Sequence, residues 1–210
     1  MPAGIRATAQ AGASVAGALR VMDAAGQARL REILKECATE ADLDVNLRML
    51  DGKTPTAQQC EEQVGTDAEG KPITRAMQWG QEKHAVALRC VQARLSVERP
   101  GGFSLEQRYR YNRDTKTLEL VSSGEEQAMI RTGRTGRLRG TLVPDVVIHS
   151  GDPLRAEASY DFKFPCPIGK EGVWRKYPEG HPWEGHRQGE MYEEALGVDA
   201  FRVSPILGVY

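Results

Sequence analysis

The sequence lacks any strong excess of charge of one sign. Its 28 lysine and arginine residues are balanced by 29 aspartate and glutamate residues, so the formal net charge is only -1. A protein that attracts nucleic acid through the field of the whole molecule has a strongly basic balance instead. That class is excluded for the chain as a whole, and any basic surface must be local.

Long apolar runs are also missing. The first twenty residues are rich in alanine and glycine, with Arg6 and Arg20 at either side, and contain no leucine-rich segment of the signal-peptide type. No later stretch has the roughly 20 apolar residues that a membrane-spanning helix needs. We therefore expect no membrane insertion by this chain. The Ala/Gly-rich start resembles a linker, or a cut made inside a longer chain.

Cysteine is scarce and is not arranged for metal binding. The four cysteines are Cys37, Cys60, Cys90 and Cys166, and they form no CxxC pair and no Cys/His run. Structural zinc sites depend on such spacings, so none is expected. The spacing favours buried free thiols, and a Cys37–Cys60 bridge is the alternative that it leaves open.

The composition that remains is that of a globular protein, with 40% apolar and 27% charged residues in a chain of 210. An intermittent apolar face from about Ala16 to Cys37 indicates a helix, and turn-rich segments follow it up to Lys71. Residues 1–71 are therefore predicted to be an Ala/Gly-rich start with a helical lead-in. Residues 72–210 are predicted to form the main domain.

The main domain is predicted to be an α/β fold. Its expected elements are a long helix over Ile73–Val97, strands over Phe103–Tyr111, Thr117–Val121, Leu142–His149 and Ala156–Phe164, a helix over Arg187–Leu196, and a strand over Phe201–Leu207. One helix, several strands, a second helix and a last strand indicate a mixed central sheet flanked by helices.

Asp161 and Lys163 lie inside one of these strand candidates. Because side chains alternate across a strand, Asp161 and Lys163 share one face. Tyr160, Phe162 and Phe164 then face the core. The alternative is a pair on the wet side of a half-exposed strand, since Asp-x-Lys tripeptides are common.

Pro144-Asp145 places a second acid at the start of the apolar run Val146–Ile148. A run of this kind is typical of a strand buried on both faces. A carboxylate beside it is costly unless it meets a cation. The alternative is a turn residue, because Pro-Asp favours turns. Two acids in this order on neighbouring strands favour a functional site.

Glu82 is a third acid, on the predicted long helix. Its neighbours on the helix are apolar, among them Trp79 and Val86. A carboxylate on such a face is expected to be paired or bound to metal. The alternative is an ion pair at the flank of the helix with Arg89 or Lys83.

These residue types suit metal-dependent hydrolysis of a phosphodiester. Asp145 and Asp161, with Glu82 assisting and the carbonyl of Phe162 as a further ligand, are expected to hold Mg²⁺, and Mn²⁺ would satisfy the same ligands. Such an ion polarises the phosphate and lowers the pKa of a bound water. Lys163 can orient that water or neutralise charge on the phosphate.

Glu82, Pro144-Asp145 and Asp161-Phe162-Lys163, in that order, resemble the motifs of the PD-(D/E)xK, or restriction-endonuclease-like, nuclease superfamily. Gln188 and Tyr192, at i,i+4 spacing on one helix, are similar to the QxxxY motif of RecB-type members. The resemblance covers roughly residues 73–207. It implies a restriction-endonuclease-like core and Mg²⁺-dependent cleavage of DNA with little sequence specificity. It also implies that Gln188 and Tyr192 support the site.

A narrower resemblance joins residues 72–80 and 160–167, with Trp183, to restriction-endonuclease-fold domains of bacterial polymorphic toxins, including type VI secretion cargo. It implies a secreted effector acting in the cytoplasm of a target bacterium, a carrier domain for the secretion apparatus and a cognate immunity protein. One alternative is a cytoplasmic repair or phage-restriction nuclease of the same fold. The other is a non-catalytic nucleic-acid-binding domain.

A local basic segment, residues 131–139, precedes Pro144-Asp145 and has glycines between its arginines. Arginine forks suit phosphate oxygens, so Arg134, Arg137 and Arg139 are predicted to contact substrate phosphates. The alternative is a flexible, solvated loop.

Residues 173–186 carry several aromatic side chains, including Trp174 and Trp183. They could stack on bases, but the favoured interpretation is that they anchor the loop to its own domain. His84, on the predicted long helix, is expected to be a core histidine.

Overall fold

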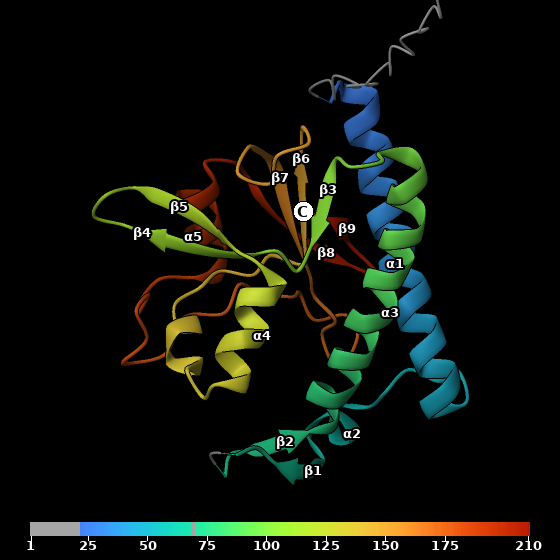
Figure 1. Cartoon of the computed structure of the whole chain (residues 1–210). Coiled ribbons are helices and arrows are strands. Elements are labelled where there is room, and N and C mark those ends of the chain that lie inside the picture. Colours follow the sequence, from blue (N-terminus) through green and yellow to red (C-terminus); the bar gives the residue numbers. More distant parts are fainter. Residues whose placement is uncertain (1–21, 69) are drawn as a thin grey trace, which may run out of the picture.

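Two long helices run side by side along one face of a central sheet (Figure 1). They are α1, Ala24–Leu50, and α3, Arg75–Glu98. The computed structural model describes residues 22–68 and 70–210. The predicted Ala/Gly-rich start therefore lies outside the described residues. Within these ranges, no helix combines the length and the apolar character that crossing a bilayer requires.

The helix α1 begins and ends with clear local signals. The carboxylate of Asp23 accepts a hydrogen bond from the backbone N–H of Gly26 at 2.8 Å, which caps the first turn. The chain leaves the helix at Asp51, whose φ of 51° is left-handed. The helix begins at Ala24 and extends further toward its C-terminal end than predicted, because its buried stripe continues beyond Cys37 through Ala38, Ala41 and Val45. Ala38 and Ala41 are buried, but alanine is only weakly apolar, so the apolar pattern in the sequence fades after Cys37.

The central sheet has five strands in the order β3-β6-β7-β8-β9. They are β3 Phe103–Leu105, β6 Val146–His149, β7 Ala156–Phe162, β8 Ala200–Ser204 and β9 Gly208–Val209. All neighbours are antiparallel except β7 and β8, which are parallel and are connected through α5, Gln188–Leu196. A parallel pair needs such a crossover, so the predicted mixed sheet is confirmed.

The sheet is covered on both faces. Val146 and Ile148 of β6 pack into one core with α1 and α3, whereas Val147 packs into a second core with α5. In β7, Tyr160 and Phe162 belong to the first core. Asp161 therefore faces the α5 side, as the alternation along the strand predicts.

The predicted strand Phe103–Tyr111 is two strands in the structure. The break falls at Glu106, whose φ of 47° is left-handed. After it, β4 (Arg108–Asn112) leaves the central sheet and pairs with β5 (Thr117–Val121) in a separate hairpin. The alternation of apolar and polar residues does not show that Glu106 redirects the chain out of the central sheet.

Several short elements lie outside the predicted ones. The elements α2 Ala57–Glu61, β1 Gln63–Thr66 and β2 Pro72–Thr74 precede α3, and α4 Ser123–Arg131 and the 3₁₀ helix η1 Thr135–Leu138 follow β5. In Figure 1, β1 and β2 form a small hairpin at the start of α3. The helices α4 and η1 carry the basic segment that precedes Asp145.

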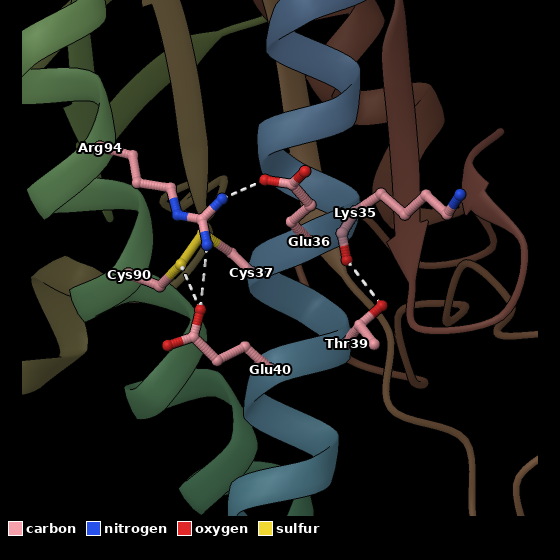
Figure 2. The surroundings of a disulfide bond; sticks show 7 residues. All are labelled: Lys35, Glu36, Cys37, Thr39, Glu40, Cys90 and Arg94. Carbon is pink, nitrogen blue, oxygen red and sulfur yellow. Dashed lines mark hydrogen bonds and ion pairs between the residues drawn. A yellow bond between two sulfur atoms is a disulfide. The ribbon is translucent and has the colours of Figure 1, made fainter.

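All four cysteines form disulfides, so both predictions for them were wrong. Cys37 is bonded to Cys90 and joins α1 to α3 (Figure 2). Cys60 is bonded to Cys166 and joins α2 to the segment after β7. The pairs are 53 and 106 residues apart in the sequence, so only the packing of the elements decides which thiols meet.

Ion pairs add to the first disulfide along the seam between α1 and α3. Arg94 contacts both Glu36 and Glu40 beside this disulfide (Figure 2). Further along, the Lys83 ammonium lies 2.6 Å from the Asp42 carboxylate, and both side chains are buried. Removing one partner of a buried ion pair strongly lowers stability, because the other charge is left buried without a counter-charge.

We expect the two disulfides to be separate stabilising crosslinks. Replacing both cysteines of either pair by serine should lower the free energy of unfolding by about 4–5 kcal/mol, because the unfolded chain regains the entropy of a closed loop. Guanidinium unfolding of the oxidised protein measures this. Unfolding curves that overlay the wild type would show that the bond in question does not form.

Candidate active site

Two acids meet at one end of the strand pair β6–β7. Asp145 directly precedes β6, and Asp161 is the last residue but one of β7. Because the pairing is antiparallel, with Val146 opposite Tyr160, the start of β6 lies beside the end of β7. The backbone N–H of Phe162 donates to the Asp145 carboxylate at 2.6 Å. This bond links the two acid-bearing segments.

Lys163 completes this group. Its ammonium contacts the Asp161 carboxylate and donates to the side-chain oxygen of Gln188 at 3.1 Å. The side chains of Asp161 and Lys163 are only 5% and 14% exposed. The structure therefore brings together Asp145, Asp161 and Lys163 in a largely buried cluster.

Helix α5 supplies the support on the other side of Asp161. Gln188 donates from its amide nitrogen to Asp161 at 3.3 Å and to the Tyr192 hydroxyl at 2.7 Å. The Tyr192 hydroxyl in turn donates to the carbonyl of Val143 at 2.9 Å. This chain of hydrogen bonds ties α5 both to β7 and to the segment before Asp145.

Two aromatic side chains of the loop formed by residues 173–186 pack around the cluster. The Trp174 ring lies 4.8 Å from the Lys163 ammonium and packs so tightly on Gly189 that a Cβ there would lie 2.5 Å from the ring. Trp183 is buried and donates to the carbonyl of Gly140 at 2.8 Å. The interpretation of these tryptophans as anchors is confirmed.

Glu82 does not reach the cluster. Its carboxylate lies 3.4 Å from the Arg48 guanidinium of α1, and it does not line the cavity beside the cluster. Successive residues of a helix are about 100° apart, so Glu82 and His84 point in nearly opposite directions. The prediction of Glu82 as an assisting ligand is therefore corrected, and the alternative partners Arg89 and Lys83 do not hold it either.

His84 is the α3 side chain that approaches the acids. Its Nδ1 lies 3.3 Å from the Asp145 carboxylate, and its ring meets Phe164 edge-on with the centroids 5.4 Å apart. The side chain is 34% exposed, so the prediction of a core histidine was wrong. One signal could have found it. His84 lies one helical turn from Gly80 and Leu88, a row that the buried stripe of α3 does not use.

These groups surround a cavity of about 730 Å³. Asp145, Asp161 and Lys163 line it together with His84. The turn between β3 and β4 adds Glu106, an exposed acid whose backbone N–H donates to the carbonyl of Asp145 at 3.0 Å. The sequence pattern did not mark Glu106, because its left-handed conformation is not apparent from its neighbours.

The predicted phosphate contacts lie beside this cavity rather than in it. Arg134 and Arg137, at η1, are exposed and form no ion pair with any residue that the structure describes. Arg139 donates to the carbonyl of Gly180. None of the three lines the cavity, but their segment leads directly into Val143 and Asp145.

Burial disfavours the charged forms of Asp145, His84 and Tyr192. Burial, and secondly the charge of Asp161, raise the pKa of Asp145 well above its usual value. Burial lowers the pKa of His84, against the opposing charge of Asp161. Burial also raises the pKa of Tyr192, which therefore stays a neutral hydrogen-bond donor. A cation placed between the acids would relieve their repulsion.

The donor set suits a divalent cation with oxygen preference. Asp145 and Asp161 supply two carboxylates, and the Phe162 backbone and the His84 ring adjoin them. Among residues 22–68 and 70–210, no three His, Cys, Asp or Glu side chains converge as a ready-made metal cluster. Mg²⁺, however, is commonly held by one or two carboxylates, with water and substrate oxygens completing its shell.

Comparison of the chain with models of protein families, with curated proteins and with solved structures gives no match. The assignment of the cluster therefore rests on its own geometry. That geometry consists of two buried acids, a lysine and a supporting glutamine and tyrosine at one end of a mixed sheet.

We expect Asp145→Asn to stabilise the metal-free protein at neutral pH. An aspartate whose folded pKa is raised contributes stability that is present below its unfolded pKa, about 3.9, and is lost as the pH rises through the folded value. Asparagine avoids that loss and can still accept from Phe162. In EDTA at pH 7 the gain should be on the order of 1 kcal/mol.

Urea unfolding between pH 3 and 8 measures this difference, and we expect it to vanish toward the acid end of that range. A gain of the same size at every pH would contradict the charge-based explanation.

Proposed function

We propose that the protein is a metal-dependent nuclease of the PD-(D/E)xK type that hydrolyses phosphodiester bonds in DNA with little sequence specificity. The observation that carries the proposal is the meeting of Asp145, Asp161 and Lys163 at one end of paired strands. The order α3, β3, β6, β7, α5 and β8 around a mixed sheet supports a restriction-endonuclease-like core.

Asp145 and Asp161 would hold Mg²⁺ or Mn²⁺, with the carbonyl of Phe162 and the imidazole of His84 adjoining them. When bound, such an ion polarises the scissile phosphate and makes hydroxide accessible from water near neutral pH. Burial keeps the pKa of His84 low, so its ring is neutral and free to accept.

Lys163 has the position to act on the reacting phosphate. Its ammonium lines the cavity and is held by Asp161 and Gln188. From there it can donate to a phosphate oxygen or to the attacking water, which stabilises charge that develops during hydrolysis. Gln188 and Tyr192 act through Asp161, because their hydrogen bonds orient its carboxylate.

A domain that only bound nucleic acid would have no need for this arrangement. Two like charges held together in a buried site lower stability, and this cost is typical of catalytic sites. The role as an antibacterial toxin, with an immunity protein and a carrier domain, stays a prediction from the sequence resemblance. The same chemistry would serve a repair or phage-restriction enzyme.

We expect Asp161→Asn and Lys163→Met each to lower Mg²⁺-dependent cleavage of plasmid DNA by at least about 100-fold, because each removes charge from the reacting centre. Glu82→Gln is the matched control, since Glu82 faces α1, and it should retain activity within about 2-fold. Circular dichroism confirms folding. Full activity of both site variants would refute the proposal.

The arginines at η1 give a separate expectation about affinity. Arg134→Gln with Arg137→Gln should weaken binding of DNA and reduce the slope of log K against log salt by about 1–2, because each arginine that contacts a phosphate releases a counterion. Fluorescence anisotropy in EDTA measures both effects without cleavage.

Arg155→Gln is the control for this pair. Arg155 lies in the turn between β6 and β7, at the opposite end of these strands from Asp145 and Asp161, and its side chain is 82% exposed. An unchanged salt slope in the Arg134/Arg137 variant would assign those arginines to a solvated loop.

A further inference from the structure

The two walls of the active-site cavity differ in chemistry. One wall is α3. No Asp, Glu, Lys or Arg side chain of this helix, all of which lies within the described residues, lines the cavity. Apart from Gln81 and His84, the helix presents small and apolar groups, namely Ala76, Met77, Gly80, Ala85 and Leu88. Met77 is 43% exposed, a large apolar side chain left open to a ligand.

Gly80 lies in the middle of this α3 wall. Glycine inside a helix costs about 0.5–1 kcal/mol relative to alanine. Packing does not require it here, because a Cβ at this position would meet no atom within 4 Å. The missing side chain therefore keeps the wall open where it faces the cavity.

The other wall is the loop after β7, which is mainly cationic because the acid in its lining, Glu171, is paired with Arg202 at 2.9 Å. Lys170 and Arg175 line the cavity, are exposed, and form no ion pair with any described residue. The loop between them is held in place at Gly172, whose carbonyl accepts from Arg202 at 2.7 Å and from the Tyr210 hydroxyl at 3.2 Å. The two charges thus stand on a supported rim, which suits a chain of phosphates.

The acids lie deep between these walls. The side chains of Asp161 and Asp145 are 5% and 13% exposed. A phosphate reaches them only if its strand enters the cavity. A DNA duplex is stiff, with a persistence length of about 50 nm, and keeps its bases paired inside. One unpaired strand can bend inward and expose its bases to an apolar wall.

We infer that the cavity receives a single unpaired DNA strand, with phosphates against Lys170 and Arg175 and with sugars and bases against the α3 wall at Gly80. This inference rests on the proposed nuclease function and names its substrate class. Single strands, unpaired arms and frayed ends are the substrates, and an intact duplex is a poor one. A volume of about 730 Å³ holds a short piece of one strand.

The test uses the full chain and three labelled DNA probes: a single strand of about 20 nucleotides, longer than the 4–16 that one binding site covers, its duplex, and a fork with one unpaired arm. Binding is measured by anisotropy in EDTA, and cleavage is measured with Mg²⁺. We expect the single strand and the fork to be bound and cleaved at least about 10-fold better than the duplex.

Variants locate the effect on each wall. Gly80→Phe fills the cavity and should lower single-strand affinity at least about 10-fold without a loss of thermal stability. Gly124→Phe, at a helical glycine of α4 outside the cavity, is the control. Lys170→Gln with Arg175→Gln should reduce the salt slope by about 1–2, whereas Arg155→Gln should not.

Equal cleavage of duplex and single strand would overturn the inference while leaving the nuclease proposal intact. Undiminished single-strand binding by a folded Gly80→Phe protein would also overturn it. Selective binding of the single strand that depends on Gly80, without Mg²⁺-dependent cleavage of any probe, would support the cavity as a single-strand binding site. It would refute the proposed nuclease activity.

Discussion

The arrangement of the molecule around its cavity depends on one electrostatic constraint: two carboxylates are held close together and away from water at the ends of β6 and β7. Asp145 is stabilised by the N–H of Phe162, and Asp161 by Lys163 and Gln188. Burial and, secondly, the charge of Asp161 keep the pKa of Asp145 raised in spite of these contacts. A cation bound between the two acids would offset this cost.

The rest of the fold keeps this arrangement rigid. The helix α3 can present His84 and Gly80 to the cavity because its other side is attached to α1 by a disulfide and a buried ion pair. On the far side of the sheet, α5 contributes the hydrogen bonds that orient Asp161. Rigid support of this kind is what a preorganised site requires.

Much of this could be predicted from local patterns. The alternation along β7 separated Asp161 from the aromatic core residues, and the strand order brought Asp145 beside it. Other predictions failed where the answer depended on a neighbouring element. Glu82 has apolar neighbours on α3, yet it points to Arg48 of α1, whereas His84 faces the acids.

The sequence by itself determined the mixed α/β class, the strand that carries Asp161, and the shared face of Asp161 and Lys163, because periods of 2 and 3.6 residues are local properties. Only the tertiary structure decided how α3 is rotated, that Glu106 breaks its strand, and which cysteines meet. These features depend on distances between elements far apart in the sequence, which no local period encodes.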